Sequence, residues 1–229
     1  MTKGHTSADQ HDGILKSRLE TMLLEFACGS LPAAESLMIS THTSLNNKAR
    51  EEFLFLEDIG GTLMETLEPA MLSDKCLHKV LDAIDNIAPE EKYLTESQCK
   101  NALPPALARI VDCATLSDLK WSPLVKGVDV IDLHLDGSSA KLRLMRCAPG
   151  YITPKHSHDE FEMTLVLDGA YSDELGQYAR GDLSIVEEDE GEHQPKACVE
   201  HGCICLTSTF APLKFTSPWH RLINYFMKF

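Results

Sequence analysis

Four side chains that can bind a metal ion lie close together in the C-terminal half of the sequence. They are His156, His158, Glu162 and His193. Imidazole nitrogens and carboxylate oxygens are good ligands for zinc, and also for iron, manganese, nickel or copper. The sequence therefore predicts a mononuclear site for one divalent metal, and the ligand types alone leave the identity of the metal open.

The spacing of the first three ligands fits a β-strand. Side chains alternate between the two faces of a strand, so these three even-numbered positions share one face if the strand is uninterrupted. His193 lies between two turn-rich stretches, Gly181-Asp182 and Gln194-Pro195, which suits a neighbouring strand folded back across the first. We therefore expect the four ligands to converge from two adjacent strands.

Glycines frame this ligand pattern. Gly150 precedes the first histidine, and Gly169 follows the strand that begins at Glu162. The whole pattern resembles the first motif of the cupin superfamily, and the stretch from Gly181 to His193 resembles its second. The second motif departs from the commoner form because Gly191-Glu192-His193 lacks a proline. The resemblance implies a small barrel that holds the metal with the four ligands.

The elements around the ligands read as short strands. Apolar or alternating runs occupy residues 128–133, 140–146, 163–167, 183–186 and 203–208. Turn signals such as Asp136-Gly137 and Asp168-Gly169 separate them, a spacing typical of an all-β barrel or jelly roll. We assign residues 113–229 to this metal-binding cupin domain and expect a short C-terminal helix after Ser217-Pro218.

The N-terminal part reads as helical. Apolar residues recur at spacings of three and four in four segments: Ile14 to Gly29, a segment from about Pro32, Ala49 to Leu67, and one that begins after Ser73-Asp74. Ser30 and Ser73-Asp74 are the expected helix caps, and Gly60-Gly61 is an expected kink. The fold class is therefore α+β in two domains, with a four-helix domain at 1–90, a linker with a short helix at 91–112, and the cupin.

Composition narrows the function. The chain has 229 residues with 43% hydrophobic content, which is enough for a real core. No apolar run is long enough to span a membrane and the N-terminus is polar, so we expect a cytoplasmic protein. A formal charge of −14 argues against direct nucleic-acid binding and favours a basic protein partner. The sequence leaves open whether the protein forms a homodimer.

The eight cysteines are expected to be thiols rather than a disulfide framework, because they are scattered and no signal peptide precedes them. Cys203 and Cys205 fall on one face of an expected strand. They form either a buried strand pair or a redox-sensitive pair near the metal.

Both halves together resemble the ChrR-type anti-sigma factors. The resemblance rests on Leu24–Leu31 and Ser40–Leu45 in the helical part, and on the His-x-His motif, Asp189–Pro195 and Gly202–Leu206 in the cupin. It implies an anti-sigma factor that sequesters an extracytoplasmic-function sigma factor through the helical domain. It also implies release of that partner on a stress signal sensed by the cupin, and zinc as the metal.

One departure from that family affects the helical domain. The family holds a zinc there with an upstream histidine and a His-x-x-x-Cys-x-x-Cys motif. Here only His42 matches, since Asn46 and Ala49 replace the cysteines and Ser17 falls near the upstream histidine. We therefore expect no zinc in the helical domain.

A metal-dependent cupin enzyme, such as a dioxygenase, is the alternative function. In that case the same four ligands would leave an open position on the metal for oxygen or a carbonyl substrate. The helical domain favours the regulator, because a small cupin dioxygenase would not need it.

Overall fold

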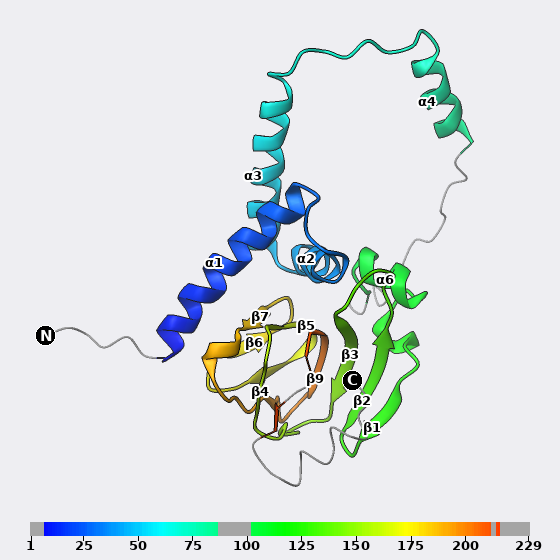
Figure 1. The fold of residues 1–229 in the computed structure, drawn as a ribbon. Helices are drawn as coiled ribbons and strands as arrows, with labels where there is room; N and C mark the ends of the chain where they lie inside the picture. The colour runs from blue at the N-terminus through cyan, green and yellow to red at the C-terminus, as the bar shows by residue number, and fades with distance from the viewer. Residues whose placement is uncertain (1–6, 87–101, 212–213, 216–229) are drawn as a thin grey trace, which may run out of the picture.

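The computed structural model describes residues 7–86, 102–211 and 214–215, and the statements below concern these residues. It has the expected α+β architecture, in which a helical N-terminal part precedes an antiparallel β-barrel (Figure 1). Most of the expected linker and the expected helix after Ser217-Pro218 lie outside the described residues.

The helical part contains five α-helices within the described residues. They are α1 (Ser7–Ala27), α2 (Ala33–Leu45), α3 (Asn47–Met64), α4 (Cys76–Asp85) and α6 (Pro105–Val111). The first four correspond to the expected helices. The short helix expected in the linker is α6, and because it packs against α2, the helical part has five helices rather than four.

Helix α2 starts next to Pro32 as expected, but the capping residues of the helices differ from those expected. Ser30 does not cap α2, because its hydroxyl donates to the Glu25 carbonyl and the capping position is taken by Pro32, whose ring already fixes an extended entry. Lys75, rather than Ser73-Asp74, precedes α4. The N-cap of α3 is Asn46, which accepts a hydrogen bond from the Ala49 amide, and α3 continues through Gly60-Gly61 to Met64.

The barrel is built from ten antiparallel strands. They are β1 (Ser122–Val125), β2 (Val128–Leu133), β3 (Lys141–Cys147), β4 (His156–Ser157), β5 (Glu162–Ser172), β6 (Gln177–Ala179), β7 (Leu183–Val186), β8 (Lys196–Ala197), β9 (Cys203–Thr209) and β10 (Lys214–Phe215). The main sheet runs β1-β2-β3-β9-β5-β6, and β7 and β8 also pair with β5. The strands predicted at 128–133 and 183–186 match β2 and β7, and β10 pairs with β4.

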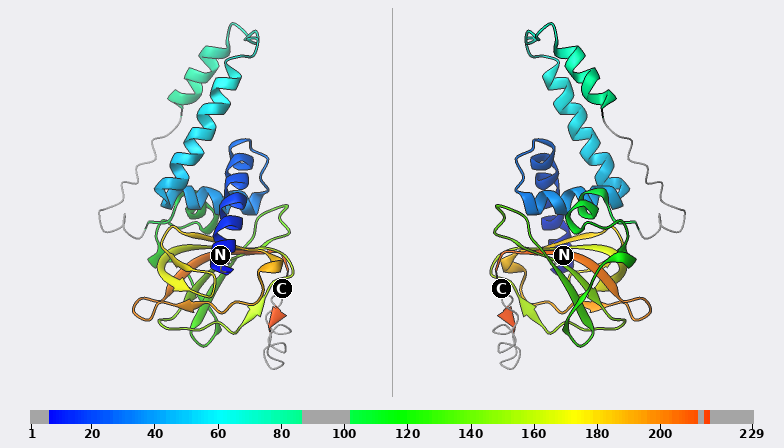
Figure 2. Two further views of the ribbon diagram at one scale, coloured as in Figure 1. Left: turned by 90° about the vertical axis from the view of Figure 1, so that its left-hand side faces the viewer. Right: turned by 90° about the vertical axis from the view of Figure 1, so that its right-hand side faces the viewer.

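Helices α1 and α2 share one hydrophobic core with the barrel. Met38 and Ile39 of α2 have no exposed surface, and they belong to the same buried cluster as Leu165 of β5 and Leu206 of β9. Helix α1 contacts β7, and α2 contacts β5 and β9. Figure 2 shows both helices against the same side of the barrel. The division into a helical domain and a cupin domain stays a prediction.

A hydrogen bond and a close backbone approach fix the end of α2 on the barrel. The Nδ1–H of buried His42 donates to the Gly181 carbonyl over 2.9 Å, and the Asn46 side-chain amide donates to the same oxygen over 3.5 Å. Gly181 has a φ of +91°, and a Cβ at this position would lie 3.1 Å from the Leu45 carbonyl oxygen. The α2–α3 corner therefore rests directly on the turn before β7.

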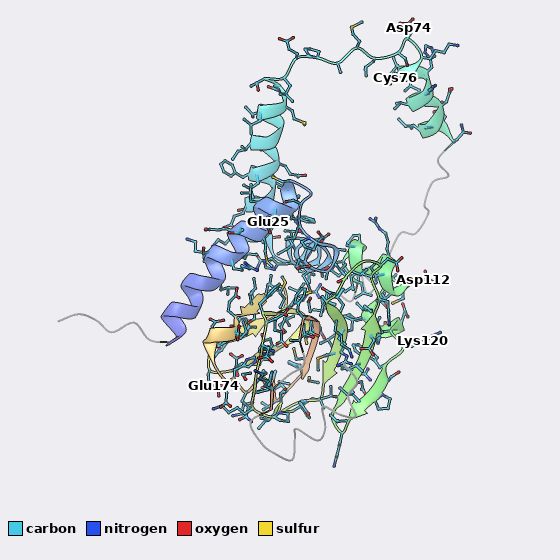
Figure 3. All side chains as sticks on the ribbon, viewed as in Figure 1. Glu25, Asp74, Cys76, Asp112, Lys120 and Glu174 are labelled. Carbon is cyan, nitrogen blue, oxygen red and sulfur yellow. The ribbon has the colours of Figure 1, made fainter. Side chains whose placement is uncertain are left out.

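The second half of α3 and all of α4 lack such cover. In Figure 1, α3 rises away from the barrel and α4 stands apart from the other labelled helices. Figure 3 shows the side chains near Asp74 and Cys76 far from those packed in the barrel. None of the described helices combines the length and the apolar character needed to cross a membrane.

Candidate metal centre

The structure brings the four predicted ligands together, but not on one strand. His156 lies in β4 and Glu162 begins β5, and His158 lies in the turn between them. The expected uninterrupted strand is therefore wrong, because the chain turns sharply between the two strands. His193 pairs with His156 through an antiparallel bridge, as the predicted fold-back requires.

The ligand atoms of these four residues all lie within 4.8 Å of one another. The three histidines are buried, and Glu162 is partly buried. Nε2 of His158 lies 3.0 Å from Nε2 of His193. Two nitrogens bound to one metal at about 2.0–2.1 Å lie roughly 2.9–3.4 Å apart for right-angled to tetrahedral geometry. The group is therefore compatible with a metal ion.

Hydrogen bonds set which ring nitrogen of two histidines faces the group. The Nδ1–H of His156 donates to the Pro154 carbonyl over 2.8 Å, and the Nδ1–H of His193 donates to Asp173 Oδ2 over 3.0 Å. Nε2 is therefore the nitrogen that each of these two rings has left to offer a metal. A histidine oriented by a carboxylate in this way is typical of metal sites.

Sequence reasoning missed Asp173, although it is part of the site. Its carboxylate is buried beside His193, and its other oxygen accepts hydrogen bonds from the amides of Leu175 and Gly176. Asp173 and Gly176 come just after β5, and both residue types are typical of turns. Only the fold shows that this turn meets His193. Asp173 therefore orients the fourth predicted ligand.

Two of the four predicted ligands are uncharged at neutral pH, the state in which an imidazole can bind a cation. Burial lowers the pKa of His156 and of His158 to about 4, so both rings are neutral near pH 7. Burial also disfavours charge on His193, but the hydrogen bond to Asp173 and the nearby negative charge of Glu162 outweigh it and raise the pKa of His193. The site thus offers two neutral imidazoles, His156 and His158, beside a carboxylate.

A cavity of about 100 Å³ lies inside the barrel beside the ligands, and Cys147, Cys203 and Cys205 line it. Cys203 and Cys205 share one face of β9 and are buried, as the strand-pair interpretation predicts. Burial raises the pKa of the Cys147 thiol to about 12, and the hydrogen bond with Cys203, together with burial, raises the pKa of Cys205. Thiols in this state are poor nucleophiles.

The three positions that align with the family's zinc motif in the helical part make other contacts. His42 binds the Gly181 carbonyl, Asn46 caps α3, and Ala49 is buried. Among the described residues, His42 belongs to no group of three or more close His, Cys, Asp or Glu side chains.

Comparisons with known proteins agree with the fold. Residues 111–212 match the ChrR Cupin-like domain family. The anti-sigma-E factor ChrR of Cereibacter sphaeroides is 35% identical over 211 residues, which cover 91% of this chain and 96% of that protein. A chain in the crystal structure of Rhodobacter sphaeroides SigE in complex with the anti-sigma ChrR is 34% identical, with a TM-score of 0.66, over 83% of this chain and 96% of that chain. This chain therefore belongs to the family of ChrR-type anti-sigma factors.

Proposed function

We propose that this protein is an anti-sigma factor that sequesters an extracytoplasmic-function sigma factor through its helical part. A stress signal that perturbs the metal centre of the cupin would then release the partner, since a local change at a switch site can bias a two-state contact. The proposal rests on the family, of which one solved member is in complex with SigE, and on the surface of α3 and α4. We place the activity in the cytoplasm.

The observation that carries the proposal is the uncovered apolar face of α3 and α4. Phe53 and Leu56 of α3 pack toward the core, and the Phe53 ring lies 5.1 Å from that of Phe26 on α1. The same stripe continues to Leu63, which is 63% exposed. An apolar stripe that is covered over one half and exposed over the other is typical of a surface that a partner completes.

Helix α4 presents a second surface of this kind. Its apolar side chains Leu77, Val80, Leu81 and Ile84 fall on one face and are each about half exposed or more. None of its residues is buried. Together, the second half of α3 and α4 form the surface that we propose for the sigma factor, called the α3–α4 face below.

Charge favours a basic partner for this face. Acidic residues Glu57, Asp58, Glu65 and Glu68 lie along or just after the second half of α3, and the whole chain has a formal charge of −14. A sigma factor that approaches DNA needs basic surface, and complementary charge speeds and orients association. The same acidic character disfavours direct contact between this protein and nucleic acid.

We propose that His156, His158, Glu162 and His193 hold one divalent metal in the cupin, and the family resemblance favours zinc over iron, manganese or nickel. The metal would tie the turn after β4, the start of β5 and the segment of His193 into one unit. Three neutral imidazoles and one carboxylate give the loaded site one net positive charge. The proposal places no second metal in the helical part.

We do not propose an enzyme. The cavity beside the ligands measures about 100 Å³, whereas pockets for drug-sized molecules are roughly 300–1,000 Å³. No described contact favours the dioxygenase alternative over the regulator.

Co-expression with each extracytoplasmic-function sigma factor of the same genome tests the function. We expect one of them to co-purify as a complex and to lose transcription activity in a reconstituted assay with core polymerase. The double variant Leu77→Asp/Leu81→Asp on α4 should abolish the complex. Val199→Asp is the matched control, because Val199 is an exposed apolar residue on the barrel. Binding that survives the α4 variant, or is lost equally in the control, would contradict the assignment of the α3–α4 face.

A further inference from the structure

Arg18 of α1 contacts two segments of the barrel at once. Its guanidinium carbon lies 5.1 Å from the centre of the Phe161 ring, in a cation–π arrangement. Its Nε lies 3.7 Å from Glu187 Oε1. Among the described residues this Nε has no hydrogen-bond partner, so the ring contact and the ion pair are what hold the guanidinium on the barrel.

Both segments lead directly to proposed metal ligands. Phe161 lies in the turn that joins His158 to Glu162, and its ring also contacts Phe210, with ring centres 4.6 Å apart. Glu187 follows β7 and forms a capping box with Glu190 at the start of the short 3-10 helix that precedes His193. Arg18 therefore joins the two ligand-bearing segments from outside the barrel.

We propose that Arg18 is a positioning residue for the metal centre, so that the helical part helps to retain the metal. This inference rests on the proposed metal role of the four ligands. The Arg18 side chain is 42% exposed, so each contact is modest, but the guanidinium loses the ring face or the ion pair if either barrel segment moves away. The ordered position of α1 and the closed position of the metal-binding segments therefore favour each other, and this coupling acts in both directions.

Arg50 shows what a purely structural arginine of the helical part looks like. Its Nε and Nη2 donate to the carbonyls of Thr43 and Ser44 over 3.1 and 2.7 Å, and thereby tie the end of α2 to α3. Neither bond reaches a ligand-bearing segment. Arg50→Ala is therefore a matched control that weakens the helices without touching the metal centre.

Zinc release from the full-length protein tests the proposal. The protein is loaded with Zn²⁺, and transfer of the metal to an excess of a chromophoric chelator is followed in Arg18→Ala, Arg18→Lys and Arg50→Ala, with the melting temperature measured for each. We expect Arg18→Ala to release zinc roughly three- to tenfold faster than wild type, because it loses a cation–π contact and an ion pair. Arg18→Lys should fall between, because lysine keeps the charge but not the planar stack. Arg50→Ala should release zinc at the wild-type rate.

Amide exchange of α1 gives a second readout. In the wild type, zinc removal should increase exchange in residues 15–26, whereas in Arg18→Ala the exchange should be the same with and without zinc. Phe161→Leu keeps an apolar side chain but removes the ring face, so it tests the same contact if Arg18→Ala folds poorly. Its α1 exchange should likewise be the same with and without zinc.

The outcomes separate this inference from the proposed metal centre. A wild-type protein that takes up no zinc would overturn both. A wild type that holds zinc, with unchanged release and unchanged α1 response in Arg18→Ala and Phe161→Leu, would overturn only the role of Arg18.

Discussion

Helices α1 and α2 differ from α3 and α4 in what covers their apolar faces. All four carry apolar residues at helical spacing, but α1 and α2 pack into a core that continues into the barrel. The second half of α3 and all of α4 present theirs to solvent. Amphipathic spacing therefore predicts a buried face without saying whether the chain itself or another protein covers it.

This difference separates two kinds of stability. The α1–α2 pair should unfold together with the barrel, because they share buried contacts with it. The α3–α4 face should contribute little to the folded chain alone and more to a complex. The four predictions below test this contrast and begin with the largest expected effect.

Loss of the metal should destabilise the barrel and the helices packed on it more than it destabilises α4. In His156→Ala/His158→Ala, the metal content should fall from about one per chain to near zero, because each lost ligand removes several kcal/mol of affinity. Elemental analysis measures the content. Full stoichiometry in the double variant would show that these histidines are not the ligands. Amide exchange should rise in the barrel and α1 but not in α4.

Truncation in the shared core should be nearly as damaging. Met38 of α2 has no exposed surface, and Met38→Ala should lower the free energy of unfolding by about 2 to 5 kcal/mol. Urea unfolding followed by circular dichroism and by barrel fluorescence should show one coincident transition. Two separate transitions would mean that the helices and the barrel unfold independently.

The pH dependence of stability should report the contact between α2 and the barrel. Burial lowers the pKa of His42 below its usual 6.5, although the Gly181 carbonyl and the charge of Asp182 oppose the shift. At this residue the unfolded chain therefore binds more protons between the two pKa values, so the contribution of His42 to stability is constant above about pH 6.5 and falls as the pH drops below it.

His42→Asn should remove this contribution to the slope between pH 6.5 and 5.5, measured by urea unfolding at each pH. His201→Asn, which replaces an exposed histidine on the barrel surface, is the matched control for the substitution itself. Equal slopes in wild type and His42→Asn would contradict the prediction.

The smallest effect on stability is expected on α4. Leu81 is 49% exposed, and Leu81→Ala should change the free energy of unfolding by less than about 0.5 kcal/mol. The same urea titration used for Met38→Ala measures it. A loss above 1 kcal/mol would mean that the chain itself covers α4 in solution.

Much of the fold followed from local pattern. The helices and most strands lie where apolar spacing placed them, because each element carries its apolar side chains on one repeating face, whether or not this chain covers that face. Helix starts were less predictable: Ser30 bonds to Glu25 rather than capping α2, since several nearby groups compete for one hydroxyl. The turn between His156 and Glu162 was also missed. A sequence pattern in which the ligands are separated by an even number of positions fits one continuous strand and two strands joined by a turn equally well.

The site shows the same limit. The four proposed ligands were readable because motif spacing carries them. Asp173 and Arg18 were not, because they meet the site through tertiary contacts from the turn after β5 and from α1 that no local spacing encodes. What surrounds a site depends on which distant segments fold together.

The turn at Gly181 has a consequence for how this protein can diverge. Its carbonyl receives His42 and Asn46, and its missing side chain leaves room for the end of α2. Any other residue there would have to adopt a left-handed backbone and displace Leu45. A change at position 181 should therefore be tolerated best together with a matching change at the end of α2, and these two distant stretches of sequence should drift as a linked pair.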